Sequence, residues 1–160
     1  MSKFRKQLTN SAQFRLFTLS QLPLAFFAGL KVKELTDAKG VVTVKHKHLT
    51  KNPFKSMYFA AQAMAAELST GVLVMDKVQQ AKPDRVSMLV FNMEGSFSKK
   101  ATGLITFTCS DGEKLDAVFD KILNSDQGKV IDLETVGTDE KGDEVSRFKF
   151  TWTLKKKQPK

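Results

Sequence analysis

A single carboxylate stands in the most apolar segment of the chain. Residues 52–71 read NPFKSMYFAAQAMAAELSTG, with no charged side chain between Ser56 and Ala66, and Glu67 follows near the far end. A helix that is apolar nearly all round is enclosed by protein. An enclosed carboxylate is costly unless it is paired, hydrogen-bonded or used in chemistry. Glu67 is therefore the first candidate for a catalytic group, and a structural carboxylate bonded to Ser69, Thr70 or a lysine is the competing interpretation.

The elements that must position Glu67 follow from the hydrophobic pattern. Helical spacing of apolar residues predicts an N-terminal helix over 4–20, a central helix over 56–74 and a shorter helix within 110–128. Apolar runs and alternation predict strands instead. These cover 30–36, 41–48, 86–94, 101–109, 129–137 and 145–154, with 86–94 pairing to 101–109 and 129–137 to 145–154 as hairpins.

An antiparallel sheet and one enclosed helix favour an α+β fold in which the sheet curls around that helix. This is a hot-dog architecture, and we expect all of residues 1–160 to form one such domain. In the last strand, Phe148, Phe150, Trp152 and Leu154 make the apolar face. Cys109 closes an apolar strand, which favours a buried, inert thiol over a nucleophile.

Charge is unevenly placed along the chain. The net charge is +9, yet residues 1–51 hold ten Lys or Arg against two acidic residues, and the tail 155–160 adds four lysines. Basic ends on a near-neutral body suit a phosphate-bearing ligand, a nucleic acid or an anionic membrane, or serve only solubility. Nucleic-acid binding is disfavoured because no helix-turn-helix pattern, zinc ligands or RNA-binding aromatic motif occurs.

The cellular setting follows from the cysteine count and the apolar runs. One cysteine excludes an intramolecular disulfide and a cysteine-based zinc site. The run 22–30 is too short for a membrane helix and is interrupted by Pro23 and Gly29. We expect a cytoplasmic protein without a membrane span or a bound metal, in which 22–30 belongs to the folded chain rather than to a cleaved signal peptide.

The pattern N-P-F-x-S-x-Y-x-A-A-Q-x-x-x-A-E-L-x-T-G at 52–71 resembles the central-helix signature of the hot-dog thioesterases. It is most similar to the PaaI-like branch that includes the domain of unknown function DUF4442. The resemblance implies an acyl-CoA thioester substrate, no further cofactor, and a homodimer or dimer of dimers. It carries the family's loop asparagine onto Asn52 and its helix carboxylate onto Glu67. The family's His-Gly-Gly turn is replaced by Tyr58, Phe59 and Ala60.

Thioester hydrolysis needs a polarised carbonyl and an activated nucleophile. The backbone N–H of Phe59 is the candidate for the first role because helix N-terminal amides are unpaired, and Glu67 is the candidate for the second. These residues are eight positions apart, or about 12 Å along a helix, so one chain cannot bring both to one carbonyl carbon. Two antiparallel central helices in a two-fold dimer can.

The remaining site candidates keep alternatives open. Asn52 is either a site residue or a turn and capping residue. Tyr58 is either a ligand contact or a core aromatic, and Gln62 either lines the cleft or satisfies a backbone group. The candidates for substrate binding are Tyr58, Gln62, Thr70, Lys82, Arg85, Lys99 and Lys100, the last four for the phosphates of coenzyme A. Loss of the His-Gly-Gly turn leaves a non-catalytic acyl-CoA or fatty-acyl binding or sensing protein as the alternative function.

Overall fold

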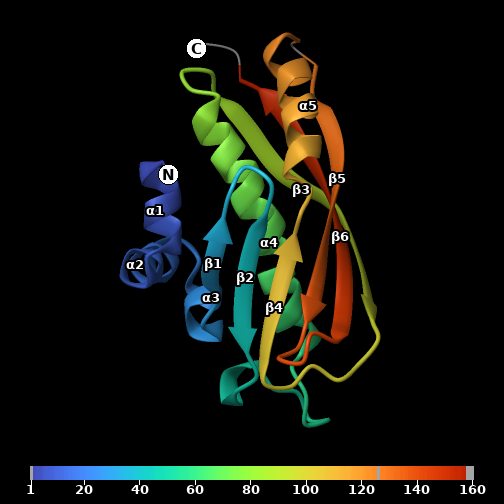
Figure 1. Cartoon of the computed structure of the whole chain (residues 1–160). Coiled ribbons are helices and arrows are strands. Elements are labelled where there is room, and N and C mark those ends of the chain that lie inside the picture. The colour runs from blue at the N-terminus through green and yellow to red at the C-terminus, as the bar shows by residue number, and fades with distance from the viewer. Residues whose placement is uncertain (1, 126, 158–160) are drawn as a thin grey trace.

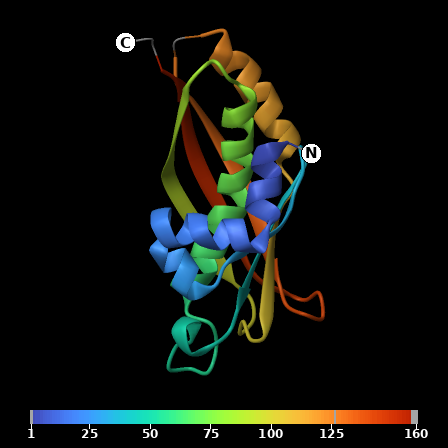
Figure 2. The same ribbon diagram turned by 90° about the vertical axis from the view of Figure 1, so that its left-hand side faces the viewer.

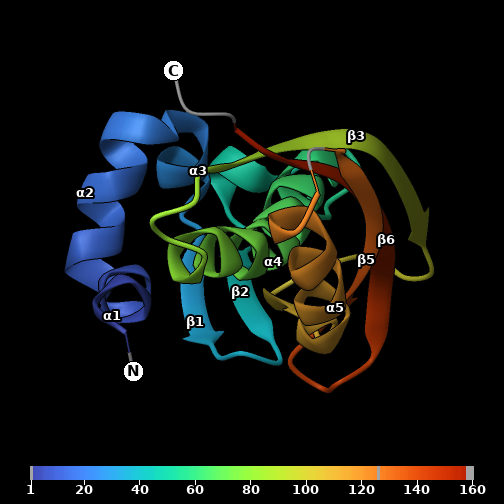
Figure 3. The same cartoon turned by 90° about the horizontal axis from the view of Figure 1, so that it is seen from above.

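The structure of the protein is a computed structural model that describes residues 2–125 and 127–157. Six antiparallel strands form one sheet in the order β1-β2-β4-β5-β6-β3, and the sheet curves around the long helix α4 (Figures 1 and 3). This is the hot-dog architecture that the element order predicts. The elements are α1 (Lys3–Thr9), α2 (Ser11–Gln21), α3 (Pro23–Ala28), β1 (Lys31–Leu35), β2 (Gly40–Lys45), η1 (His48–Thr50), α4 (Phe59–Gln80), β3 (Val86–Phe97), β4 (Leu104–Cys109), α5 (Gly112–Leu123), β5 (Lys129–Thr138) and β6 (Glu144–Lys156).

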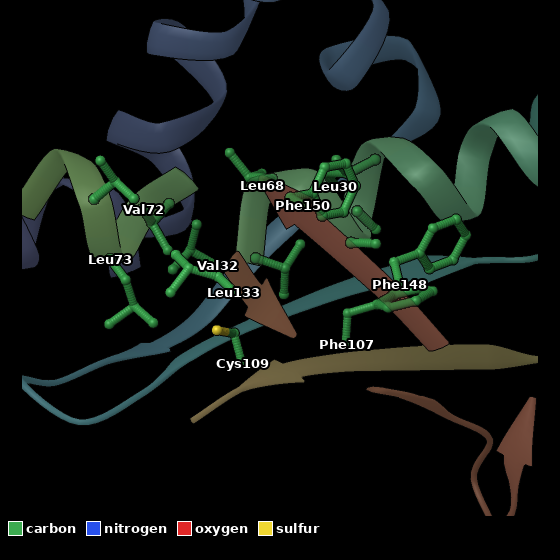
Figure 4. Close-up of a cluster of buried hydrophobic side chains, with 14 of the residues drawn as sticks. Leu30, Val32, Leu68, Val72, Leu73, Phe107, Cys109, Leu133, Phe148 and Phe150 are labelled. Carbon is green, nitrogen blue, oxygen red and sulfur yellow. The ribbon is translucent and has the colours of Figure 1, made fainter. Parts of the chain in front are cut away.

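The core lies between α4 and the concave face of the sheet (Figure 4). Small residues of α4 such as Ala65 and Ala66 are fully buried, which lets the sheet approach the helix closely. The approach is close at Gly40 in β2, where an added Cβ would lie 2.4 Å from the carbonyl oxygen of Ser69. Phe148, Phe150, Trp152 and Leu154 of β6 are buried as their alternation predicts. Cys109 is buried as well, and burial raises its pKa to about 12.

The N-terminal segment is not the single helix expected over 4–20. It folds as α1, α2 and α3, which form a layer beside β1 and α4 (Figure 2). The first break occurs at Asn10, whose side-chain oxygen accepts hydrogen bonds from the backbone N–H groups of Ala12 and Gln13, both at 3.1 Å. Asparagine competes with helical backbone bonding in this way. The second break is at Pro23, which starts α3 at a position where proline is tolerated.

The central helix is shifted towards the C-terminus relative to the expected range 56–74. It starts at Phe59 because residues 52–57 form a turn that includes Lys55 at a φ of 60°. It continues to Gln80 because Asp76 and Lys77 are buried and paired rather than solvated. Strand 41–48 likewise ends early, at Lys45, so the histidines at 46 and 48 lie beyond it.

The expected pairing of 86–94 with 101–109 is wrong. β3 pairs along its whole length with β6, whereas β4 lies between β2 and β5. Apolar alternation marks a strand and its buried face, but it does not determine which strand lies next to it. The hairpin between β5 and β6 is confirmed. Of the basic tail 155–160, Lys155 and Lys156 continue β6, and residues 158–160 lie outside the described part of the chain.

Candidate active site

A pocket opens at the start of α4. Its volume is about 500 Å³, and we call it the helix-start pocket. The loop before α4, the first turn of the helix and the segment after β3 form its walls. Six of the predicted site residues lie together here, and they are Asn52, Tyr58, Phe59, Gln62, Lys99 and Lys100.

The backbone N–H of Phe59 is available at this pocket. Phe59 is the first residue of α4, and Tyr58 before it provides no side-chain cap. Within residues 2–125 and 127–157, no acceptor is bonded to the Phe59 N–H. A free amide at the positive end of a 22-residue helix attracts a developing negative charge. This amide can therefore polarise a carbonyl oxygen placed in the pocket.

The side chain of Asn52 organises the loop that forms the pocket wall. Its oxygen accepts hydrogen bonds from the backbone N–H groups of Phe54 and Ser56, at 2.9 and 3.2 Å. Its amide nitrogen donates to the hydroxyl of Ser56 at 3.0 Å and to the carbonyl of Met57 at 3.3 Å. These bonds occupy both ends of the amide and match the turn interpretation of Asn52.

Two further pocket residues differ in their freedom to contact a ligand. Gln62 is buried, donates to the Met57 carbonyl at 3.4 Å and accepts from the Ser146 hydroxyl at 2.8 Å, so its amide is engaged within the protein. Tyr58 is about half exposed, and its ring packs edge-to-face against Phe59 with 4.8 Å between centroids. Tyr58 and Phe59 therefore present aromatic surface at the mouth of the pocket.

The four cationic candidates do not form one group. Lys99 is paired with Asp139 and Asp143 at 2.7 and 2.6 Å, and these hydrogen bonds raise its pKa. Lys100 donates to the carbonyl of Phe54 at 3.3 Å and is exposed, which makes it the less compensated charge of the two. Lys82 and Arg85 lie beyond the opposite end of α4, on the order of 30 Å along the helix from Phe59.

Glu67 lines a different pocket. This second, open pocket, the Glu67 pocket, has a volume of about 320 Å³ and is bordered by the α2–α3 corner, Leu30 and one face of α4. Within the described ranges, the Glu67 carboxylate accepts no hydrogen bond and forms no ion pair. Burial raises its pKa above the ordinary glutamate value. An uncompensated carboxylate of this kind holds a proton more readily and is suited to acid–base chemistry.

The structural alternative for Glu67 is a bond to Ser69, Thr70 or a lysine, and among the described residues none of these bonds its carboxylate. The Ser69 hydroxyl is 2.7 Å from both the Ala66 carbonyl and the Thr135 hydroxyl. The Thr70 hydroxyl donates to the backbone carbonyl of Glu67 at 2.9 Å and accepts from the Trp152 indole at 3.1 Å. Thr70 is completely buried and lines neither pocket.

The two pockets share no lining residue. Phe59 and Glu67 are eight residues apart on one helix, which separates the free amide from the carboxylate by about 12 Å. Sequence reasoning did not find that the segment around Pro23 covers Glu67, because the two are more than forty residues apart in the chain. The proline break in the apolar run was the available signal.

Two features are absent from the described residues. Among them, no cluster of three or more His, Cys, Asp or Glu side chains is arranged to hold a metal ion. None of their helices is both long and apolar enough to cross a bilayer.

Comparison with known proteins places the chain in a family. No curated protein matches it significantly. Among solved structures, a protein of unknown function and probable thioesterase from Pseudomonas aeruginosa is 22% identical, with a TM-score of 0.78 over 89% of this chain and 93% of that chain. A protein of unknown function from Chlorobaculum tepidum is 18% identical, with a TM-score of 0.77 over 94% and 99% of the two chains.

A thioesterase from Haemophilus influenzae is 10% identical, with a TM-score of 0.67 over 96% of this chain and 95% of that chain. At these identities the likeness establishes the fold. The family described as "Domain of unknown function (DUF4442)" matches residues 11–154. Since the match spans nearly the whole length, the chain belongs to the DUF4442 family, and its fold is the hot-dog fold of the thioesterases.

Proposed function

We propose that the protein hydrolyses acyl-CoA thioesters at a site shared between two copies of the chain. The Phe59 N–H of one copy polarises the thioester carbonyl, and Glu67 of the other activates water or attacks the carbonyl carbon. The observation that carries the proposal is a pair of groups on α4 that have no hydrogen-bond partner among the described residues. One is a free amide in the helix-start pocket and the other is an unpaired carboxylate in the Glu67 pocket.

The free edge of the sheet supports a two-fold partner. β3 is an edge strand that is paired only with β6. Leu89 and Phe91 on it are 68% and 74% exposed, and a long apolar edge of this kind is a ready template for another strand. Antiparallel pairing of two β3 strands is isologous, as a two-fold dimer requires. Phe97 at the end of β3 lines the helix-start pocket, so a second copy on this edge would border that pocket.

The location of Glu67 fits the same arrangement. An added Cβ on Gly71 would lie 3.3 Å from Glu67 Oε1 and 3.4 Å from the Trp152 ring, so the carboxylate and the indole border one space. Trp152 pairs with Val90 of β3 in the sheet. The carboxylate therefore lies near a side chain of β6, the strand that pairs with β3. Lys100 beside the helix-start pocket offers a charge for a phosphate of coenzyme A.

The testing experiment mixes two inactive chains. Phe59→Pro removes the proposed N–H donor at a first helical position, where proline is tolerated, and Glu67→Gln removes the proposed base. In a shared site, a heterodimer of the two variants contains one intact site. Random exchange should then restore about a quarter of the wild-type thiol release from an acyl-CoA panel. Activity that stays at the level of the separate variants would refute the shared site.

A non-catalytic acyl-CoA binding protein is the second candidate. It is favoured by the replacement of the His-Gly-Gly turn by Tyr58, Phe59 and Ala60, because the aromatic rings of Tyr58 and Phe59 pack together at the start of α4. Acyl-CoA binding measured by calorimetry, without thiol release from any member of the panel, would establish binding in place of hydrolysis.

A further inference from the structure

The outer surface of α2 and α3 carries exposed aliphatic and aromatic side chains. In α2, Phe14 and Thr18 face inward, whereas Leu16 and Leu19 lie on the opposite side of the helix and are 69% and 50% exposed. We call the outward-facing residues the α2–α3 patch, and it consists of Leu16, Leu19, Leu22, Leu24 and Phe27. Scattered apolar residues are normal on a surface, but a group gathered on one layer indicates an interaction site.

The segment that carries the patch has charges of one sign. The segment 2–33 contains six Lys or Arg and no Asp or Glu. Arg5 is neutralised by Asp37 and Asp76, but Arg15, Lys31 and Lys33 are exposed and form no ion pair among the described residues. Lys47 adds to this group, because its amine lies beside Gly29 at the end of α3. Apolar side chains rimmed by cations fit a surface that is negatively charged and apolar underneath.

The three N-terminal helices form the outer layer on this side of the molecule, and nothing else in the described chain covers them (Figures 2 and 3). Arg15 stacks over the ring of Phe26 at 5.0 Å, which joins α2 to α3. The salt bridges of Arg5 hold α1 against α4. The layer of α1, α2 and α3 is therefore fixed to the rest of the domain, and the apolar side chains of the patch stay exposed on its outer surface.

We propose that the α2–α3 patch docks on the surface of an anionic phospholipid membrane. The leucines and Phe27 enter the interface between headgroups and acyl chains, and the surrounding lysines and Arg15 pair with lipid phosphates. Docking would bring the Glu67 pocket to the lipid boundary, since Leu22 and Leu24 belong to both the patch and the pocket wall. The docking does not depend on thioester hydrolysis, and it is peripheral rather than spanning.

The test is sedimentation of the full chain with vesicles. Vesicles of phosphatidylcholine and phosphatidylglycerol in equal parts should carry the protein down. Vesicles of phosphatidylcholine alone should carry at least about tenfold less, because each basic residue near an anionic surface contributes on the order of a fivefold gain in partitioning. Raised salt should release the protein. Equal binding to both kinds of vesicle, or binding to neither, would overturn the proposal.

Two pairs of substitutions locate the surface. Leu16→Gln with Phe27→Gln removes apolar area, and Lys31→Gln with Lys33→Gln removes charge. Each pair should lower partitioning by on the order of tenfold or more. The matched controls are Val130→Gln on β5, and Lys121→Gln with Lys141→Gln, all at exposed positions on other faces. Controls that weaken binding as much as the patch variants would contradict the assignment.

A second copy of the chain is the other possible occupant of the patch. Sedimentation velocity of the wild type and of the Leu16→Gln, Phe27→Gln variant separates the two cases. The proposal expects the same oligomer for both. A smaller oligomer for the variant, without vesicle binding by the wild type, would overturn membrane docking and assign the patch to self-association.

Discussion

Two groups on α4 carry the proposed chemistry, and they are of different kinds. Phe59 contributes a backbone N–H, which is set by helix geometry rather than by a side chain. Glu67 contributes a carboxylate whose pKa is raised because burial disfavours the charged form. The first group is tested by removing a hydrogen-bond donor and the second by removing a charge.

Substituting Phe59 separates its amide from its ring. Phe59→Pro should lower kcat for acyl-CoA hydrolysis by about a hundredfold or more, the usual loss for one oxyanion donor. The fold should survive, because Tyr58 already has the extended backbone that a following proline favours. Phe59→Ala is the matched control, since it removes the ring and keeps the N–H. Thiol release measured for both variants decides the matter, and equal losses would assign the effect to the ring.

Glu67→Gln should lower turnover by on the order of a hundredfold, because it removes the proposed base while keeping its size. Its effect on stability should depend on pH. The folded-state pKa of Glu67 is raised, so the folded protein binds more protons between the ordinary pKa of about 4.5 and the raised value. Wild-type stability therefore falls as pH rises through that window, and the glutamine variant lacks this loss.

Melting temperatures of the wild type and the Glu67→Gln variant, measured from pH 4 upward, check this prediction. The melting temperature of the variant should rise relative to that of the wild type as pH rises through this window, and it should remain higher above it. A variant that is less stable at neutral pH, with hydrolysis intact, would make Glu67 a structural residue.

At the scale of elements, the N-terminal layer depends on one partly buried cluster of charges. Arg5 of α1 donates to Asp76 of α4 at 2.6 and 3.0 Å, and it also pairs with Asp37 in the turn between β1 and β2. These bonds to Arg5 lower the pKa of Asp37 to about 2. Asp76 is only 1% exposed, so it depends on Arg5 and on a bond from Gln80 for compensation. The cluster joins three segments that are distant in sequence.

Arg5→Ala should destabilise the protein by about 3 kcal/mol, because it leaves the Asp76 carboxylate buried with only Gln80 as a partner. Arg147→Ala is the control. It breaks an exposed pair with Glu144, which should cost less than about 1 kcal/mol. Urea unfolding of both variants gives the comparison. Similarly small losses of unfolding free energy in both variants would mean that the cluster does not hold α1 in place.

At the scale of the whole molecule, the shared site requires a dimer. Phe91→Lys places a charge on the exposed edge of β3, where two copies are proposed to pair, and like charges across a two-fold axis repel. The variant should sediment as a monomer at micromolar concentration and lose hydrolysis together with the dimer. Val130→Lys, at a similarly exposed position on β5, should change neither property. A wild-type monomer, or an active monomeric variant, would refute the shared site.

The local pattern of the sequence was sufficient for the class of fold and for residues that line one pocket. The apolar run after Ser56 identified a central helix enclosed by protein, and the alternation in 145–154 identified the buried face of the last strand. The family resemblance at 52–71 pointed to Asn52, Tyr58, Phe59 and Gln62, and these residues line the helix-start pocket together because they are neighbours along the chain. Such features depend on side-chain periodicity and short-range geometry, which a sequence carries directly.

Only the tertiary structure determined which distant segments contact these residues. The partner of β3 is β6, more than forty residues later, because strand pairing is set by the closing of the whole sheet rather than by the nearest loop. Glu67 is covered by the α2–α3 corner, and Lys82 and Arg85 are removed from the helix-start pocket by the length of α4. Thr70 faces inward, where its hydroxyl accepts a hydrogen bond from the buried indole N–H of Trp152 on a distant strand. Contacts between distant segments form only when the core closes around α4. The local pattern of residues therefore does not predict any one of these contacts.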